Sequence, residues 1–281
     1  MKNTDGGGAA ASMACLTPPQ MEQKACEVGD SKASMPMWQM IPLSMLAGIF
    51  IGCGALFMLV VKGDSTLPFA ASQVVGGVCF SLGLICVTVC GAELFTGNSL
   101  MVIGAAEGRY TWGKVVRNWA VVWVFNFVGS LVLVAIVFFA GIASMNDGGV
   151  GQAMVSTAAS KASLGWGVIF FRGIICNLLV CLAVWMGFAG KTVIDKIFTT
   201  IFPVMAFVAV GAEHCVANMF FLPLGFALKT SGAVEATGAN VANLGIAGIF
   251  SNLSASTLGN MVGGCILVGA MYWWAYRKKK A

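Results

Sequence analysis

Six long stretches of apolar residues alternate with short polar segments along this chain. A membrane-spanning helix needs about 20 mainly apolar residues, and each stretch is long enough to supply them. The stretches cover residues 43–61, 70–106, 115–141, 166–188, 197–228 and 256–276. The pattern therefore predicts an all-α membrane protein with six transmembrane helices in a domain of residues 37–281, preceded by a polar N-terminal segment of residues 1–36.

The second and fifth stretches are too long for one simple crossing, and each contains a polar interruption. Gly91-Ala92-Glu93 lies inside the second stretch and Gly211-Ala212-Glu213 inside the fifth. A carboxylate beside a glycine at that depth predicts a helix that breaks and then resumes. Irregular backbone within a membrane is tolerated only where protein buries it or where it lines a watery cavity. The two interruptions are therefore a first indication of a pore.

The two halves of the chain share three short motifs in the same order. The matching segments are 91–98 (GAELFTGN) with 211–218 (GAEHCVAN), 126–129 (NFVG) with 260–263 (NMVG), and 47–49 (AGI) with 172–174 (RGI). Halves with three spans each must enter the membrane in opposite directions. The motifs therefore predict a 3+3 inverted repeat over about residues 43–141 and 166–276, a design that places the permeant near the membrane midplane.

The composition narrows the class of protein. Of the 281 residues, 58% are hydrophobic and only 10% are charged, against about 45–50% and about 25% in a typical soluble domain. A soluble enzyme, a nucleic-acid-binding protein and a disordered scaffold are therefore excluded. A single histidine rules out bis-histidine haem ligation and a Cys/His zinc site, and the ten cysteines form no CxxC pair. We expect no enzymatic activity, no cofactor and no metal.

Basic residues gather on one side of the predicted membrane. They lie at both termini and in the loops after the second and fourth spans: Lys24, Lys32, Arg109, Lys114, Arg117, Lys191, Lys196 and the run 277–280. The opposite side has only Lys62, Lys161 and Lys229. Because cytoplasmic loops carry the excess of Lys and Arg, we expect both termini to be cytoplasmic in a multi-pass protein of the inner (plasma) membrane.

His214, the only histidine, lies directly after Glu213 in the second interruption. Histidine is the side chain whose unperturbed pKa lies near neutrality, and ionisable residues inside a membrane are functional candidates. The repeat places Leu94 at the equivalent position, so the interruption itself does not require a histidine. We therefore expect His214 to act in the pore. The alternative is a neutral histidine that only holds the broken backbone by hydrogen bonds.

The other polar residues within the spans also have two interpretations each. We expect Glu93 and Glu213 to be structural, accepting hydrogen bonds from backbone N–H groups freed at the interruptions; the alternative is that they carry protons. Thr96 and Asn177 either hydrogen-bond a permeant or join helices. Lys161 either attracts anions into a vestibule or reaches the membrane interface. We assign no role to Arg172, which lies inside the fourth span.

Three segments together resemble one known family. They are GAELFTGN at 91–98, CNLLVCLAVWM at 176–186 and GAEHCVANM at 211–219. In order and spacing they are similar to the formate/nitrite transporter family from the first span to the end of the chain. The resemblance implies an aquaporin-like fold of six helices, assembled as a homopentamer in which each protomer has its own pore.

The resemblance also implies roles for individual residues. His214 would be the central pore histidine, and Thr96 would lie on a flexible Ω loop in contact with it. The other implied positions are Leu94 and Phe207 in a cytoplasmic-side constriction, Phe80, Leu84 and Val180 in an outer hydrophobic narrowing, Lys161 in the vestibule and Asn177 near the pore centre. Arg172 matches no functional position.

These roles imply passive or proton-coupled passage of a small monovalent anion of a weak acid. Dry constrictions should block a bare anion, whereas a proton delivered by or through His214 would form a small neutral acid that can cross. We expect formate as the substrate, with nitrite and then hydrosulfide as alternatives. Outside this family, an aquaporin-like channel for neutral solutes would have paired Asn-Pro-Ala motifs, and neither interruption contains a proline.

Overall fold

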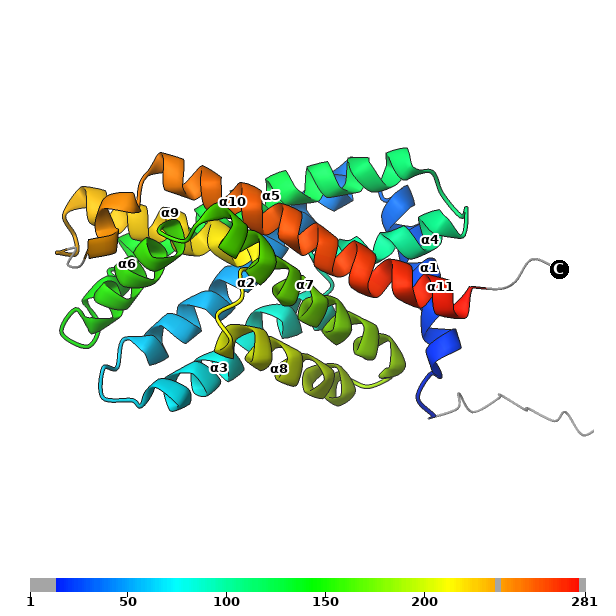
Figure 1. Ribbon diagram of the computed structural model, residues 1–281, viewed down its shortest axis with the longest axis horizontal. Coiled ribbons are helices and arrows are strands. Elements are labelled where there is room, and N and C mark those ends of the chain that lie inside the picture. Colours follow the sequence, from blue (N-terminus) through cyan, green and yellow to red (C-terminus); the bar gives the residue numbers. More distant parts are fainter. Residues whose placement is uncertain (1–13, 236–238, 278–281) are drawn as a thin grey trace, which may run out of the picture.

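The computed structural model describes residues 14–235 and 239–277, and every regular element among these residues is helical (Figure 1). The longer helices are α1 (Pro18–Ser34), α2 (Met37–Lys62), α3 (Phe69–Cys90), α5 (Trp112–Phe139), α6 (Gly149–Ala162), α7 (Trp166–Ala189), α8 (Val193–Ala209), α9 (Cys215–Ser231) and α10 (Ile246–Met261). Shorter elements are η1 (Gly97–Leu100), α4 (Met101–Ala106), η2 (Ile142–Ser144), η3 (Ala239–Asn243), η4 (Val262–Ala270) and α11 (Met271–Tyr276).

Five helical segments within the described residues are long and apolar enough to cross a membrane. They are α2, α3, α5, α7 and the continuous run Ile246–Tyr276 formed by α10, η4 and α11. The predicted fifth span, 197–228, consists instead of two helices, α8 and α9, each of 17 residues. The predicted second span, 70–106, divides into α3 and the short apolar helices η1 and α4. The chain is thus an all-helical, multi-pass membrane protein.

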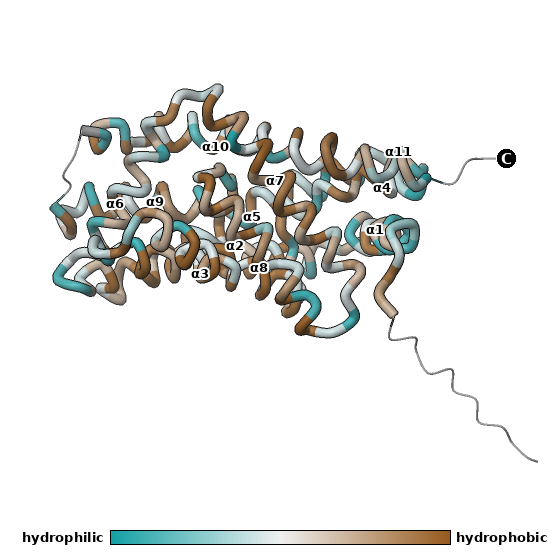
Figure 2. The backbone as a smooth tube through the Cα atoms, turned by 60° about the horizontal axis from the view of Figure 1, so that its bottom comes forward, coloured by the Kyte–Doolittle hydropathy of each residue, from teal (hydrophilic) through white to brown (hydrophobic). Residues whose placement is uncertain are grey.

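Large apolar side chains are exposed on the outer surface, where contact with water would be unfavourable. Phe139 is 85% exposed, Phe69 79% and Trp38 78%. Hydrophobic residues occur on every long helix of the body, whereas hydrophilic ones gather at its two ends and on α1 (Figure 2). Contiguous exposed apolar surface of this kind marks contact with lipid or with another protein.

The helices of the two halves pack in the same order. In the first half α2 lies between α3 and α5, and in the second half α7 lies between α8 and α10. The halves meet where α3 packs on α8 and α5 packs on α9. Glycine permits the closest of these approaches: a Cβ at Gly129 would collide with the Met45 carbonyl on α2, and one at Gly263 would collide with the Ile174 carbonyl on α7. Such small-residue contacts are typical of helix packing in membranes.

Both polar interruptions begin with a left-handed glycine. Helix α3 ends at Cys90, and Gly91 has a φ of 80°; helix α8 ends at Ala209, and Gly211 has a φ of 69°. Residues with a Cβ rarely adopt this conformation, so glycine lets the chain turn sharply out of the helix. After each turn the chain becomes helical again, at Gly97 in the first half and at Cys215 in the second.

The N-terminal segment is helical and packed from Pro18 onward. Helix α1 lies against α4, α5, α7 and α11 at one end of the bundle (Figure 1). Met21, Ala25 and Cys26 are buried against the body, and Asp30 forms an ion pair with Arg109. The predicted segment 1–36 is therefore partly an ordered element of the fold. Its first 13 residues lie outside the described part of the chain.

Candidate functional site

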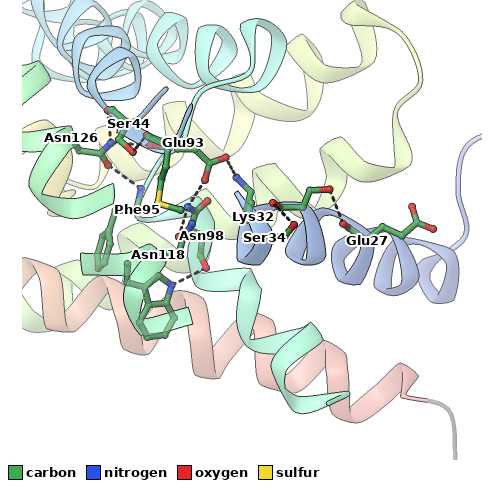
Figure 3. Close-up of polar contacts among 12 residues, drawn as sticks. Glu27, Lys32, Ser34, Ser44, Glu93, Phe95, Asn98, Asn118 and Asn126 are labelled. Atoms are coloured by element: carbon green, nitrogen blue, oxygen red, sulfur yellow. Dashed lines mark hydrogen bonds and ion pairs between the residues drawn. The ribbon is translucent and has the colours of Figure 1, made fainter. Parts of the chain in front are cut away.

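Glu93, in the first interruption, is 5% exposed and is the centre of a charged network (Figure 3). Its Oε1 accepts from Lys32 Nζ of α1 at 2.6 Å, and its Oε2 accepts from Asn98 Nδ2 at 2.8 Å. Asn98 Nδ2 also donates to Asn118 Oδ1 of α5 at 2.8 Å. The carboxylate is thus neutralised by a lysine that lies 61 residues away in sequence.

Glu213, in the second interruption, has the same set of partners from the other half. Its Oε1 accepts from Lys161 Nζ of α6 at 2.8 Å, and its Oε2 accepts from Asn218 Nδ2 at 2.7 Å. Asn252 of α10 donates to the same Oε2 at 3.2 Å. The prediction that the two glutamates accept from backbone N–H groups is therefore wrong, because an ammonium group and side-chain amides occupy the carboxylate oxygens.

Two asparagines hold the backbone of the interruptions. Asn126 donates to the carbonyls of Ser44 and Glu93 at 2.7 and 2.9 Å and accepts from the N–H of Phe95 at 3.0 Å. These three bonds join α5, α2 and the turn. Because they satisfy backbone groups that the helix break leaves free, they replace the hydrogen bonds that a continuous helix would have made.

Asn260 repeats this arrangement. It donates to the carbonyls of Gly173 and Glu213 at 2.8 and 2.9 Å and accepts from the N–H of Cys215 at 2.9 Å. Gly173 therefore corresponds to Ser44, the other carbonyl acceptor. The sequence match of 47–49 with 172–174 is wrong by four positions, since it aligned Gly173 with Gly48.

His214 joins the two interruptions. Its Nε2 lies 2.9 Å from Thr96 Oγ1, and both residues are buried. The other ring nitrogen, Nδ1, accepts from the backbone N–H of Ala217 at 3.1 Å and so caps the start of α9. A nitrogen that accepts a hydrogen bond carries no proton, so the ring proton of the neutral histidine lies on Nε2 and is donated to Thr96. The expected contact between Thr96 and His214 is present.

Asn177 of α7 supports this contact from the side. Its Nδ2 lies within hydrogen-bonding distance of the Thr96 carbonyl at 3.2 Å, Ser99 Oγ at 3.1 Å and the Asn260 carbonyl at 2.7 Å. The residue is fully buried. In this structure Asn177 therefore links the first interruption to α10.

Cavities open towards these residues from both ends of the bundle. The first cavity, of about 510 Å³, is lined by Glu93, Leu94 and four lysines: Lys24, Lys32, Lys191 and Lys196. The second, of about 530 Å³, lies at the other end and is lined by Lys62, Lys161, Arg172 and Glu213 among others. A third and smaller cavity, of about 120 Å³, shares Lys62, Lys161 and Gly211 with the second and reaches His214.

The predicted constriction residues are grouped differently from the expectation. Phe80 and Phe207 contact each other edge to face, with centroids 5.6 Å apart, and both line the third cavity near His214. Leu84 and Leu94 line the first cavity, at the opposite end. The cavities thus group Phe207 with Phe80 and Leu84 with Leu94, and the two constrictions themselves stay a prediction. Val180 is buried in α7 and is not among the lining residues of these cavities.

Two residues of the site were missed. Phe221 of α9 stacks on Phe80 with centroids 6.5 Å apart, and Lys161 Nζ lies 5.5 Å from the centre of its ring. The second is Lys32, which the sequence indicates only as one of the basic residues that set the orientation in the membrane. The internal repeat could have identified it, because Glu93 corresponds to Glu213 and therefore needs a counterpart of Lys161.

Comparison with known proteins agrees with the all-helical membrane fold. The family model described as formate/nitrite transporter matches residues 19–274. The chain is 39% identical over 272 residues to the formate channel FocA of Escherichia coli K12, covering 94% of this chain and 95% of that one. It is 38% identical to FocA of Haemophilus influenzae over 270 residues, with 92% and 94% covered. A solved structure described as a pentameric formate channel with formate bound superposes with a TM-score of 0.77 at 36% identity, covering 91% of this chain and 99% of that one.

Proposed function

Because the chain belongs to the formate/nitrite transporter family, we propose that it is a membrane channel that carries formate through a passage beside His214. The formate channels among its relatives and the formate-bound structure support formate as the substrate. Nitrite, and after it hydrosulfide, are the alternative substrates, because both are small monovalent anions of weak acids. The relatives reported above are channels, in agreement with a function that involves no chemical conversion of the substrate.

The charge distribution supports passage of an anion. Both end cavities are lined by an excess of cations: four lysines and one carboxylate in the first, and two lysines, one arginine and one carboxylate in the second. Basic residues around a concave mouth raise the local concentration of anions. Formate would therefore collect at either end of the protein before it enters the narrow part.

The narrow part favours a neutral species. Phe80 and Phe207 close the third cavity beside His214, and Leu84 and Leu94 face the first cavity. An anion that leaves water for such apolar surroundings loses its hydration without replacement, at a cost of several kcal/mol or more. Formic acid is small and uncharged, so a proton gained near the constriction would let it cross.

His214 is positioned to supply or relay this proton. In the neutral ring the Nε2 proton points at Thr96, and Nδ1 is held by the N–H of Ala217. For this, Nδ1 would first take a proton from a cavity in place of its bond to Ala217, and the resulting imidazolium would donate one proton to the bound anion and return to the neutral ring. The passage would then act as a channel for the anion at higher pH and as a proton-coupled importer at lower pH.

The duplicated contacts support the predicted topology. The matched partners of Asn126 and Asn260, and of Glu93 and Glu213, fit a 3+3 inverted repeat in which α3 with η1 and α4, and α8 with α9, are the two broken spans. Lysines from the N-terminal helix and from the loop after α7 line one common cavity. That arrangement supports a cytoplasmic location for this end and for both termini, in a plasma membrane.

The exposed apolar side chains of the bundle support an assembly as well as contact with lipid. The related solved structure is described as pentameric. We therefore include a homopentamer, with one passage in each protomer, in the proposal. Cross-linking of the purified protein in detergent would give a ladder ending at the pentamer.

The contact of Thr96 with His214 between two cation-lined cavities is the observation that carries the proposal. It is tested by uptake of formate, nitrite and hydrosulfide into proteoliposomes at about pH 5 and about pH 7, with the wild type and His214→Asn. We expect formate flux in the wild type and an altered pH dependence in the variant. Flux of water or glycerol without any anion would contradict the proposal. Formate flux with an unchanged pH dependence in His214→Asn would remove His214 from the mechanism.

A further inference from the structure

Arg172 is a cation on the seventh residue of membrane-spanning helix α7, and its guanidinium group has no ion pair or hydrogen bond with the described residues. The guanidinium lines the second cavity, and Nη1 lies 3.8 Å from the point where a Cβ on Gly211 would stand. A charge inside a membrane span is costly and is placed where it meets a partner or a watery path. Among the described residues, the second cavity offers Arg172 such a place.

The other charges of this cavity leave Arg172 uncompensated. Lys161 is neutralised by Glu213 at 2.8 Å. Lys62 donates to the side-chain carbonyl of Gln73, which is uncharged. Two positive charges, Lys62 and Arg172, therefore remain in excess around a space of about 530 Å³.

The interruption does not need a cation at this position. The backbone carbonyl of Arg172 accepts from the N–H of Glu213, and in the first half the carbonyl of Leu43 accepts from the N–H of Glu93 in the same way. Leu43 is apolar, yet the first interruption is held by the same set of hydrogen bonds as the second. The guanidinium is therefore not explained by the local structure.

Arg172 lies where the second cavity adjoins the third. Gly211, over which the guanidinium lies, lines both the second cavity and the third, and the third cavity reaches His214. Lys62 also lines both cavities. An anion held by Arg172 and Lys62 would thus lie at the entrance to the narrow cavity.

We propose that Arg172 and Lys62 form an anion-binding site in the second cavity, where a small monovalent carboxylate or similar anion is held before it enters the narrow passage to His214. This inference rests on the proposed function, since it names the capture site for the same permeant. A guanidinium suits the task because its fork of N–H donors matches the two oxygens of a carboxylate. The site acts on capture, so it sets the concentration of formate at which flux saturates rather than the maximal flux.

The test is the concentration dependence of formate flux in phosphatidylcholine proteoliposomes at low and at high ionic strength. We expect Arg172→Gln to raise the half-saturating concentration roughly three- to tenfold at low ionic strength, with maximal flux little changed. High salt should reduce this difference to less than about twofold, because it screens exposed charges. Arg172→Lys keeps the charge but not the fork of donors, so it should shift the half-saturating concentration less than Arg172→Gln does.

Matched variants separate this role from others. Lys114→Gln removes one positive charge from an exposed position at the start of α5 and should leave both parameters unchanged. Lys62→Met removes the second excess cation and should show the same salt-dependent shift, which keeps the test valid if Arg172→Gln does not assemble. A shift that appears only when phosphatidylglycerol is added would assign Arg172 to lipid headgroups and overturn the proposal.

The flux measurements distinguish failure of the proposed function from failure of the proposed anion-binding site. If the wild type carries no formate, the proposed function is wrong. If the wild type carries formate and both cavity variants saturate at the wild-type concentration, or shift equally at every ionic strength, the function stands and the binding site is wrong.

Discussion

Asn126 and Asn260, 134 residues apart, make the same three hydrogen bonds in the two halves of the molecule. Each donates to two backbone carbonyls and accepts one backbone N–H, and each is fully buried. One amide side chain in each half therefore satisfies three backbone groups at the sharp turns that shape the centre of the protein.

This relationship predicts that replacing either asparagine by leucine lowers the stability of the protein by a similar amount. Asn126→Leu and Asn260→Leu each leave three buried backbone groups without a partner, at about 1–3 kcal/mol per group. We expect both variants to lose most of their thermal stability in detergent, measured as the melting temperature of the purified protein. Asn243→Ala, at an exposed position, is the control and should change stability by less than about 0.5 kcal/mol. A large difference between the two buried variants would contradict the equivalence.

Replacing His214 should separate its capping role from its role in the passage. Asparagine is a good N-cap, so His214→Asn can still accept from Ala217, whereas His214→Ala cannot. We expect the alanine variant to be less stable than the asparagine variant by about 1 kcal/mol, measured by thermal unfolding. Both variants lose the contact with Thr96. Equal stability of the two would show that the bond to Ala217 contributes little.

The ion pair of Lys32 with Glu93 is predicted to contribute more to thermal stability than the exposed ion pair of Lys24 with Glu27 on α1. Lys32→Met leaves the buried Glu93 carboxylate without a cation, and we expect a loss of roughly 2 kcal/mol in thermal stability. Adding Glu93→Gln should restore part of this loss, because no buried charge then remains. Lys24→Met breaks only the exposed pair with Glu27 and should cost less than about 1 kcal/mol. No recovery in the double variant would argue against the pair.

Cys26 should report whether α1 is docked. Burial, and then the neighbouring Glu22 carboxylate, raise the pKa of the Cys26 thiol to about 12. At mildly alkaline pH the thiol is therefore protonated, and the thiolate that reacts with maleimide is scarce. Site-resolved mass spectrometry should find exposed Cys15 labelled and Cys26 unlabelled. Labelling of Cys26 should increase severalfold in Lys32→Met, and fast labelling in the wild type would show that α1 does not stay docked.

The sequence predicted the elements that depend on local pattern and failed where partners come from distant segments. Apolar length located the five segments of the described residues that are long enough to cross a membrane, and glycine beside glutamate located both turns. The partners of Glu93 and Glu213 were not accessible in this way, since Lys32 and Lys161 lie 61 and 52 residues from the glutamates that they neutralise. Only a comparison of the two halves could have joined them.

The cavity linings divide the predicted constriction residues in a way that the sequence does not give. Phe80 and Leu84 are one turn apart on α3, a rise of about 6 Å, and so follow one another along the same face of the helix. The family resemblance groups them in one narrowing, whereas Phe80 lines the cavity that reaches His214 and Leu84 lines the cavity at the other end. Where a passage closes depends on the packing of Phe207 from α8, which helical periodicity cannot give.

Helix α1 supplies the cation for a carboxylate at the centre of the first half, and this has a practical consequence for protein engineering. A truncation that begins the chain at α2 removes Lys32 and leaves Glu93 buried and unneutralised. Shortened versions made for expression or crystallisation should therefore keep α1 or carry Glu93→Gln as well. Purification tags joined ahead of α1 need a linker long enough to let this helix reach its place beside α4 and α11.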